Sequence, residues 1–176
     1  MNTLSNPSLK SLNWFGVILL SLTFWFSSSL LMDLVIMPGL FVSGMMSQAD
    51  FGAAGYSLFW VFNRLELVCA ALILTGLLVA RQARDDQGVR VSGIRSRWAV
   101  EIALALLAIT LGLTYGLSPA MAALGASLRA LDPAAALPAG MNQLHALYFG
   151  LEALKLLGCG TLLSLFFQDL QVSETL

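Results

Sequence analysis

The sequence predicts an all-α integral membrane protein that folds as a four-helix bundle, and two observations support this prediction. Hydrophobic residues make up 58% of the 176 residues, charged residues only 11%, and the mean hydropathy is +0.82. A chain with so few polar residues cannot cover the surface of a soluble globule. In addition, four apolar stretches reach the roughly 20 residues of helix that cross a hydrocarbon core. We therefore expect residues 1–176 to form a single transmembrane domain.

The four predicted spans cover residues 14–36, 56–80, 98–117 and 144–167. The loop 81–97 between the second and third spans is rich in arginine, with Arg81, Arg84, Arg90, Arg95 and Arg97. Basic loops are retained on the cytoplasmic side of a membrane. Both termini are therefore expected to be cytoplasmic, with these arginines as topology determinants. Contact of the same arginines with anionic lipid or a partner is the alternative.

The other two connections each begin near a proline. Pro38 and the glycine after it are expected to end or kink the first helix, which leaves residues 37–55 as a re-entrant or interfacial segment. Residues 120–131, "AMAALGASLRAL", are rich in helix-forming residues. They predict a short amphipathic helix at the outer surface.

A weak internal repeat links these two connections. A proline is followed six residues later by a glycine at 38–44 and again at 119–125, and "NRLEL" in the second span resembles "NQLHA" in the fourth. The pattern predicts two tandem helix hairpins of the same orientation, and chance similarity of two apolar hairpins is the alternative. In a true repeat, Glu66 and His145 occupy equivalent places and could share a proton or a cation.

The fourth span carries His145, Glu152 and Lys155, although each ionised group at bilayer depth costs roughly 2.5–3.5 kcal/mol. At about 100° of rotation per residue, the three side chains fall on one side of the helix. Such a polar stripe must face the bundle interior or a wet cavity. Glu152 and Lys155 have i,i+3 spacing and are expected to pair. An ion or substrate path along the stripe is the alternative.

Two further charge pairs are expected to have structural roles. Asp33 lies near the outer end of the first span, where it could reach Arg64 in the second. Arg97 and Glu101 have i,i+4 spacing near the start of the third span and predict an interfacial ion pair.

The sequence predicts no enzyme and no catalytic residue. It contains no His-x-x-x-His or Cys-x-x-Cys spacing for a metal, no Gly-rich phosphate loop and no recognisable Ser, His and acid motif. No cofactor or metal is predicted. The alternative is a haem or chlorophyll bound by His145, and a haem with two histidine ligands would need a second chain to supply the other histidine. The net charge of -1 gives no general attraction to nucleic acid. The expected partners are the lipid bilayer, other membrane subunits or further copies of this chain.

Two short motifs resemble a known family. "DLVIMPGLF" at the end of the first span and "QLHALYFGLE" in the fourth are similar to the four-span membrane proteins typified by transmembrane protein 205, also called domain of unknown function 4149. The matching positions are Met37–Phe41 and Leu144–His145. The resemblance implies the four-span topology and a bacterial cytoplasmic or thylakoid membrane, but no reaction, because the function of the family is not settled. Family members often carry Gly after this His and Asn seven residues beyond it, where this chain has Ala146 and Glu152.

Two functions therefore remain open. One is an accessory or structural subunit that packs against a larger membrane complex, with Gly150, Gly158 and Gly160 allowing close helix approach. The alternative is a small oligomeric transporter or ion-coupled carrier that uses the intramembrane polar stripe. The sequence favours the accessory subunit, because four short spans enclose little volume and no coordination motif is present.

Overall fold

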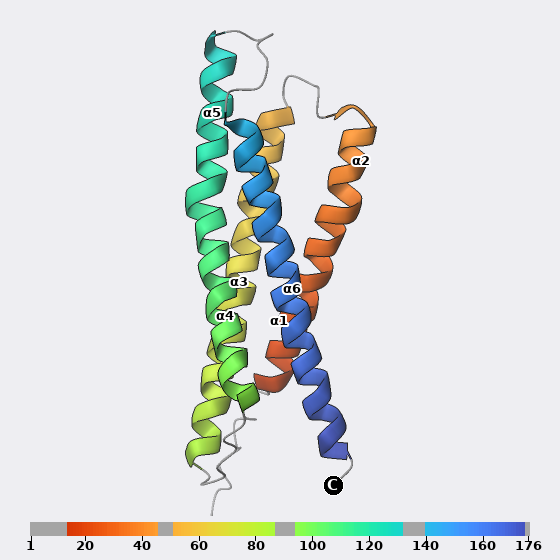
Figure 1. Cartoon of the computed structure of the whole chain (residues 1–176), viewed down its shortest axis with the longest axis vertical. Coiled ribbons are helices and arrows are strands. Elements are labelled where there is room, and N and C mark those ends of the chain that lie inside the picture. Colours follow the sequence, from red (N-terminus) through yellow and green to blue (C-terminus); the bar gives the residue numbers. More distant parts are fainter. Residues whose placement is uncertain (1–13, 46–50, 87–93, 132–139, 175–176) are drawn as a thin grey trace, which may run out of the picture.

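The structure, a computed structural model, describes residues 14–45, 51–86, 94–131 and 140–174. Every regular element in these ranges is helical (Figure 1). In chain order the elements are α1 (Trp14–Leu31), η1 (Met32–Ile36), α2 (Met37–Val42), α3 (Phe51–Asp86), α4 (Ile94–Gly112), η3 (Leu113–Leu117), α5 (Ser118–Leu131) and α6 (Met141–Glu174). The elements η1 and η3 are short π-helical segments within longer helices.

Four long helices result, because α1, η1 and α2 run on as one and α4, η3 and α5 as another (Figure 1). Four segments are long and apolar enough to cross a membrane: Trp14–Val42, Ala54–Gln82, Arg97–Leu124 and Met141–Gln168. The predicted all-helical architecture with four helices of membrane-spanning length is thus confirmed. Each segment has 28 or 29 residues, and a helix of about 42–44 Å exceeds a hydrocarbon core of about 30 Å. The helices therefore tilt in a bilayer or project beyond its core.

Pro38, which was expected to end or kink the first helix, does not end it, and Pro119 does not end the third. Pro38 and Pro119 each lie two residues after a π-helical segment. Proline lacks an N–H group and its ring collides with the carbonyl four residues earlier, and the widened π-helical turn accommodates both effects. Residues 37–42 therefore continue the first helix, and residues 120–131 continue the third instead of forming a separate surface helix. The remaining parts of these connections, 46–50 and 132–139, lie outside the described residues.

The helices form a ring in which α1 packs on α3, α3 on α4, α4 on α6 and α6 on α1. Consequently α3 and α6 face each other across a diagonal of the bundle. We call the end where α1 begins and α6 ends the proximal end, and the end with α2 and α5 the distal end (Figure 1). Gly76 lets α3 approach α1 closely, because an added Cβ would lie 2.5 Å from Cγ1 of Ile18.

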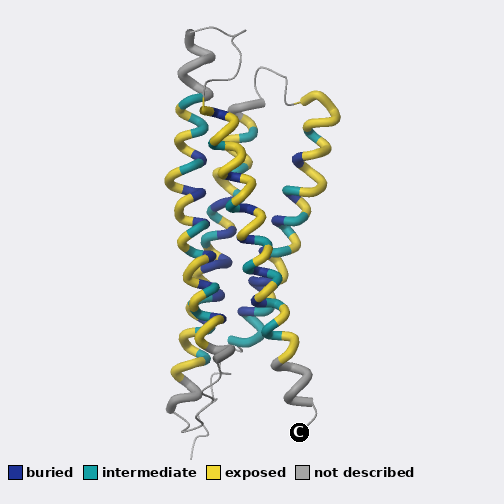
Figure 2. The backbone as a smooth tube through the Cα atoms, in the orientation of Figure 1, coloured by how far each residue is buried: buried dark blue, intermediate teal, exposed yellow. Residues whose placement is uncertain are grey.

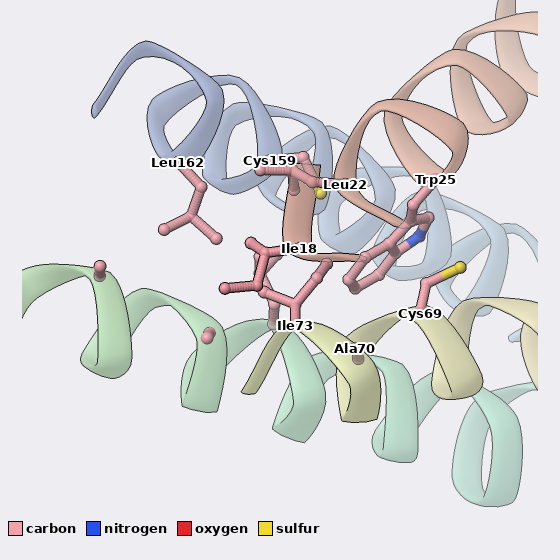
Figure 3. Close-up of a cluster of buried hydrophobic side chains, with 11 residues drawn as sticks. Ile18, Leu22, Trp25, Cys69, Ala70, Ile73, Cys159 and Leu162 are labelled. Carbon is pink, nitrogen blue, oxygen red and sulfur yellow. The ribbon is translucent and has the colours of Figure 1, made fainter. Parts of the chain in front are cut away.

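A cluster of buried apolar side chains packs between the helices (Figure 3), and its members come from the proximal half of the bundle. Its buried members are Ile18, Leu22, Trp25, Cys69, Ala70, Ile73, Ala99, Ala103, Leu106, Cys159 and Leu162. Both cysteines are free, buried thiols. Exposed positions run along the outside of all four long helices (Figure 2). Many of them carry large hydrophobic side chains, as suits a surface that contacts lipid.

Buried polar side chains occupy the centre and the distal half, apart from Ser21 in the proximal half. They are Ser29, Asn63, Glu66, Thr110, Thr114, Ser118, Glu152 and Lys155. The hydroxyls of Thr110 and Thr114 donate to carbonyls of their own helix and need no other partner. The interior of the bundle therefore changes from mainly apolar in the proximal half to a mixture of polar and apolar side chains in the distal half.

Buried positions recur at fixed spacings between diagonal helices. The buried residues Ile18, Leu22, Trp25, Ser29, Met32 and Met37 are followed 81 residues later by the buried residues Ala99, Ala103, Leu106, Thr110, Leu113 and Ser118. The two π-helical segments share the same spacing. In α3 and α6, Glu66, Cys69, Ile73 and Gly76 are followed 86 residues later by Glu152, Lys155, Cys159 and Leu162. At this spacing Glu66 falls on Glu152, and the equivalence of Glu66 with His145 stays a prediction.

Candidate functional site

Three charged side chains meet at the centre of the bundle, and we call them the charge triad. Lys155 on α6 forms ion pairs with Glu66 on α3 and with Glu152 on its own helix. Its Nζ donates to Oε2 of Glu66 and, at 2.9 Å, to Oε1 of Glu152. The exposed fractions are 2% for Glu66, 3% for Glu152 and 1% for Lys155. Lys155 lies at the middle of the segment Met141–Gln168, where a long side chain cannot reach the membrane surface.

Helical geometry brings the triad together. Glu152 and Lys155 are one turn apart on the same face of α6, the contact that their spacing predicts. Glu66 approaches from the opposite corner of the ring. Within the described residues, no Cα of α3 lies within 8 Å of a Cα of α6. Only long side chains such as lysine and glutamate can therefore bridge the two helices.

Helix α1 supplies further partners for Glu66. The indole N–H of Trp25 donates to Oε1 at 2.9 Å, and the hydroxyl of Ser29 donates to the same oxygen at 3.0 Å. Together with Lys155, three donors converge on this carboxylate. The two carboxylate oxygens of Glu66 are thus both held by hydrogen bonds, Oε1 from α1 and Oε2 from α6.

Glu152 is bound less completely. Its Oε2 lies 2.8 Å from Nζ of Lys155 but makes no hydrogen bond of acceptable geometry. With both carboxylates ionised, the triad carries one negative charge in excess, and an uncompensated charge inside a membrane is costly. An added proton or monovalent cation removes the excess. Glu152 has the free acceptor position that can take it.

A short chain of hydrogen bonds crosses the bundle next to the triad, on its distal side. The hydroxyl of Tyr148 on α6 donates to Oδ1 of Asn63 on α3 at 3.3 Å. Nδ2 of Asn63 in turn donates to the hydroxyl of Ser118 on α5 at 2.9 Å. Tyr148 lies one turn from Glu152, and Asn63 one turn from Glu66. Among the described residues, these hydrogen-bonded polar groups thus lie next to the triad on its distal side.

Asp33 on η1 lies beside the triad, within electrostatic range of Lys155 and Glu66. Its Oδ2 is buried and makes no hydrogen bond. The expected pair between Asp33 and Arg64 is not formed. Instead, the guanidinium of Arg64 stacks on the ring of Trp60 at 3.5 Å and donates to the Trp60 carbonyl at 3.2 Å. The i,i+4 spacing of these two residues favours this cation–π contact on the outer face of α3.

His145 lies apart from the triad. The structure therefore does not bring it together with Glu66, with which it was expected to share a proton or cation. Its ring is exposed, and Nδ1–H donates to the carbonyl of Met141 at 3.0 Å. Ten residues of helix, about 15 Å, separate His145 from Lys155, and Lys155 is the residue that contacts Glu66. Haem or pigment ligation by His145 stays a prediction.

The predicted charge pair Arg97–Glu101 and Arg81 lie toward the proximal end. Arg97 and Glu101 are both exposed, and the structure records no ion pair between them; exposed pairs gain little in stability. Arg81 is exposed near the end of its span. Arg84 and Arg95 lie in helices, but their side chains are outside the described part of the structure, as is the whole of Arg90. The topology and lipid roles of these arginines stay predictions.

Four residues of this site were not predicted from the sequence: Trp25, Ser29, Asn63 and Ser118. A tryptophan in the middle of an apolar span is a usable signal, because its indole N–H needs an acceptor when buried. The i,i+4 spacing to Ser29 and the i,i+3 spacing from Asn63 to Glu66 place these pairs on common helix faces. The contact between Asn63 and Ser118 depends on the packing of helices that are far apart in the sequence, so no local sequence pattern predicts it.

Comparison of the chain with protein-family models, curated proteins and solved structures found no match.

Proposed function

We propose that this protein is a small ion-coupled membrane carrier whose charge triad binds and releases one proton or one monovalent cation. The observation that supports this proposal is the uneven charge of the buried triad, with two carboxylates for one ammonium group. Ionisable residues inside a membrane are rare and commonly mark ion paths or proton relays. Glu152, with one oxygen free of hydrogen bonds, is the exchanging group, and Glu66 and Lys155 hold it in place.

A purely structural role fits the triad less well. One acid and one base would neutralise each other, and apolar residues of the same volume often stabilise a protein better than a buried ion pair. Here a second carboxylate, Glu152, adds an excess charge, and Asp33 adds a third carboxylate nearby. This excess is costly for stability and useful for reversible ion binding.

The proposed path is one-sided. In this proposal an ion reaches the triad from the distal side, where the hydrogen-bonded groups of Tyr148, Asn63 and Ser118 lie. The apolar core closes the proximal half. If the arginine-rich loop is cytoplasmic, as predicted, the triad opens to the outside and is sealed from the cytoplasm. A carrier would then open the proximal side in a second conformation.

An accessory subunit is the second candidate, and a groove on the outer surface favours it. Phe26 and Leu30 of α1 line this groove together with residues of α6, namely Ala153, Leu156, Leu157, Gly160 and Thr161. Small residues such as Ala153 and Gly160 let a helix of another membrane subunit approach closely. The mass of the detergent-solubilised particle separates the candidates: a homo-oligomer favours the carrier, and one chain bound to other subunits favours the accessory role. The resemblance to the four-span family and a bacterial or thylakoid location stay predictions.

An ion-flux assay tests the proposal. Purified protein is reconstituted into liposomes that contain a trapped pH indicator, and a potassium gradient with valinomycin sets the membrane potential. We expect faster entry of protons, or of labelled sodium in a parallel assay, than in protein-free vesicles. Glu152→Gln should abolish this flux, and Glu101→Gln, which changes an exposed carboxylate on α4, should retain it. Two results would refute the carrier. One is that neither protons nor sodium enter faster than in protein-free vesicles, and the other is full flux with Glu152→Gln.

A further inference from the structure

The distal ends of the two interrupted helices are packed differently. We call η1 with α2, residues Met32–Val42, the arm. Its counterpart at the spacing of 81 residues, η3 with the first part of α5, packs on both α3 and α6. Within the described residues, no Cα of the arm lies within 8 Å of a Cα of α3, α4, α5 or α6. Helix α2 accordingly stands apart from the other helices at the distal end (Figure 1).

The contact between α5 and α3 has counterpart residues on the arm and on α6, but the backbones at these residues are not in contact. Ser118 rests on Asn63, which is 1% exposed. At the spacings of 81 and 86 residues, these two correspond to Met37 on the arm and Phe149 on α6. Met37 is 8% exposed, which shows that it faces the bundle, whereas Phe149 is 50% exposed. The site on α6 that would receive the arm is therefore uncovered.

We propose that the arm closes onto α6 at Phe149, as α5 rests on α3 at Asn63, and that closure carries Asp33 onto the charge triad as its fourth charged group. The role of Asp33 in this inference rests on the proposed ion-binding function, whereas the closure itself does not. Asp33 corresponds to Thr114, which is 7% exposed inside the bundle. Its Oδ2 is buried without a hydrogen-bond partner, so closure offers it contacts that it now lacks.

The arm has a structural basis for such a movement. The π-helical segment η1 is the part of the arm that joins α1, and Pro38 follows it in α2. Both features interrupt the regular i→i+4 hydrogen bonds of an α-helix and are sites where helices bend. A rotation at this junction moves the arm toward α6 without disturbing the apolar core at the proximal end.

The charges link closure to the state of the triad. Around Asp33, Glu66 faces it from α3, and Glu152, Lys155 and the neutral Tyr148 face it from α6. Approach of the Asp33 carboxylate is opposed by the excess negative charge of an empty triad. Once Glu152 has taken up a proton or the triad a cation, this net repulsion falls, because the remaining charges of Glu66 and Lys155 balance each other. The loaded triad therefore favours the closed arm, and the empty triad favours the open one.

Cysteine cross-linking tests the closure. In a chain with Cys69→Ala and Cys159→Ala, we introduce the pair Met37→Cys and Phe149→Cys. A disulfide requires Cα atoms within roughly 7 Å, and the open arm does not allow this distance. We expect several-fold more cross-linking than for the control pair Val35→Cys and Phe149→Cys, because Val35 is 60% exposed on the arm. Equal, background-level cross-linking of both pairs would overturn the closure.

Spin-label distances give a second measurement if the cysteine pair disturbs folding. Labels at Val42 and Leu147, which are 84% and 50% exposed, should show two distance populations, one of them shorter than the structure allows. A single population that matches the open arm under all conditions would overturn the closure.

The charge dependence tests the role of Asp33. Glu152→Gln imitates the neutral carboxyl and should raise cross-linking of Met37→Cys with Phe149→Cys, and Asp33→Asn should remove this rise. Cross-linking that does not respond to Glu152→Gln would refute the part assigned to Asp33. Ion flux is measured separately, so a chain that closes but conducts neither protons nor sodium refutes the carrier and leaves the closure standing.

Discussion

Lys155 on α6 and Glu66 on α3 form a buried ion pair across the diagonal of the bundle, although 89 residues separate them in the chain. The backbones of the two helices are too far apart to touch within the described residues. Together with the hydrogen bonds from Trp25 and Ser29 to Glu66, this pair connects α1, α3 and α6 at the centre of the span. The ion pair therefore contributes to both the packing and the electrostatics of the site.

Replacing the lysine of the triad should be the most damaging single change. Lys155→Leu leaves Glu66 and Glu152 buried without a counter-ion, and loss of one partner of a buried pair typically costs about 3–5 kcal/mol. Glu152→Leu should cost less, because Lys155 keeps its pair with Glu66. Thermal unfolding in detergent measures both effects.

Combined substitutions of Glu66, Glu152 and Lys155 distinguish a triad from a simple ion pair between Glu152 and Lys155. If Lys155 paired with Glu152 alone, the double variant Glu152→Leu, Lys155→Leu would recover stability. Because Glu66 would still be stranded, we expect recovery only when Glu66→Leu is added. A double variant as stable as the wild type would show that the ion pair across the diagonal contributes little.

Removing a single hydroxyl from the hydrogen-bond chain of Tyr148, Asn63 and Ser118 should lower the stability of the protein. Ser118→Ala removes the acceptor of Asn63 Nδ2, and a buried donor without a partner costs about 1–3 kcal/mol. Thr161→Ala is the matched control, since its exposed hydroxyl donates only to its own helix. Equal melting temperatures of the two variants would argue against the buried contact.

Gly76 should not tolerate a side chain. A Cβ at this position would lie 2.5 Å from Cγ1 of Ile18, and overpacking of a core typically costs about 1–3 kcal/mol. Gly112→Ala provides the control, because no atom lies within 4 Å of its added Cβ. Thermal unfolding should therefore separate Gly76→Ala from Gly112→Ala, and matching curves would contradict the close packing of α1 on α3.

Accessibility of single cysteines tests the orientation in the membrane. Ser43 is exposed at the distal end and Gln82 at the proximal end. In a chain without native cysteines, Ser43→Cys should react with an impermeant maleimide on intact cells, and Gln82→Cys only after permeabilisation. The opposite result would place the arginine-rich loop outside and reverse the direction of the proposed ion path.

The parts of this structure that depend on local spacing could be predicted from the sequence. The lengths of the apolar stretches predicted four helices of spanning length, and the i,i+3 spacing predicted the contact of Glu152 with Lys155. The extent of the helices past Pro38 was missed, because π-helical segments compensate for proline and leave no clear pattern in the sequence. The partner of Glu66 was also missed, since short motifs aligned it with His145 while packing brings it to Lys155.

The most direct test of the proposed ion site is the protonation of Glu152 itself. Infrared difference spectra of the lipid-reconstituted protein, recorded between acidic and alkaline sodium-free buffer, report the carbonyl band of a protonated buried carboxyl group. We predict that this band grows on acidification in the wild type and in Glu101→Gln, and that it is lost in Glu152→Gln. A wild type without such a band, or an unchanged band in Glu152→Gln, would contradict the assignment of the charge triad as the site of proton exchange.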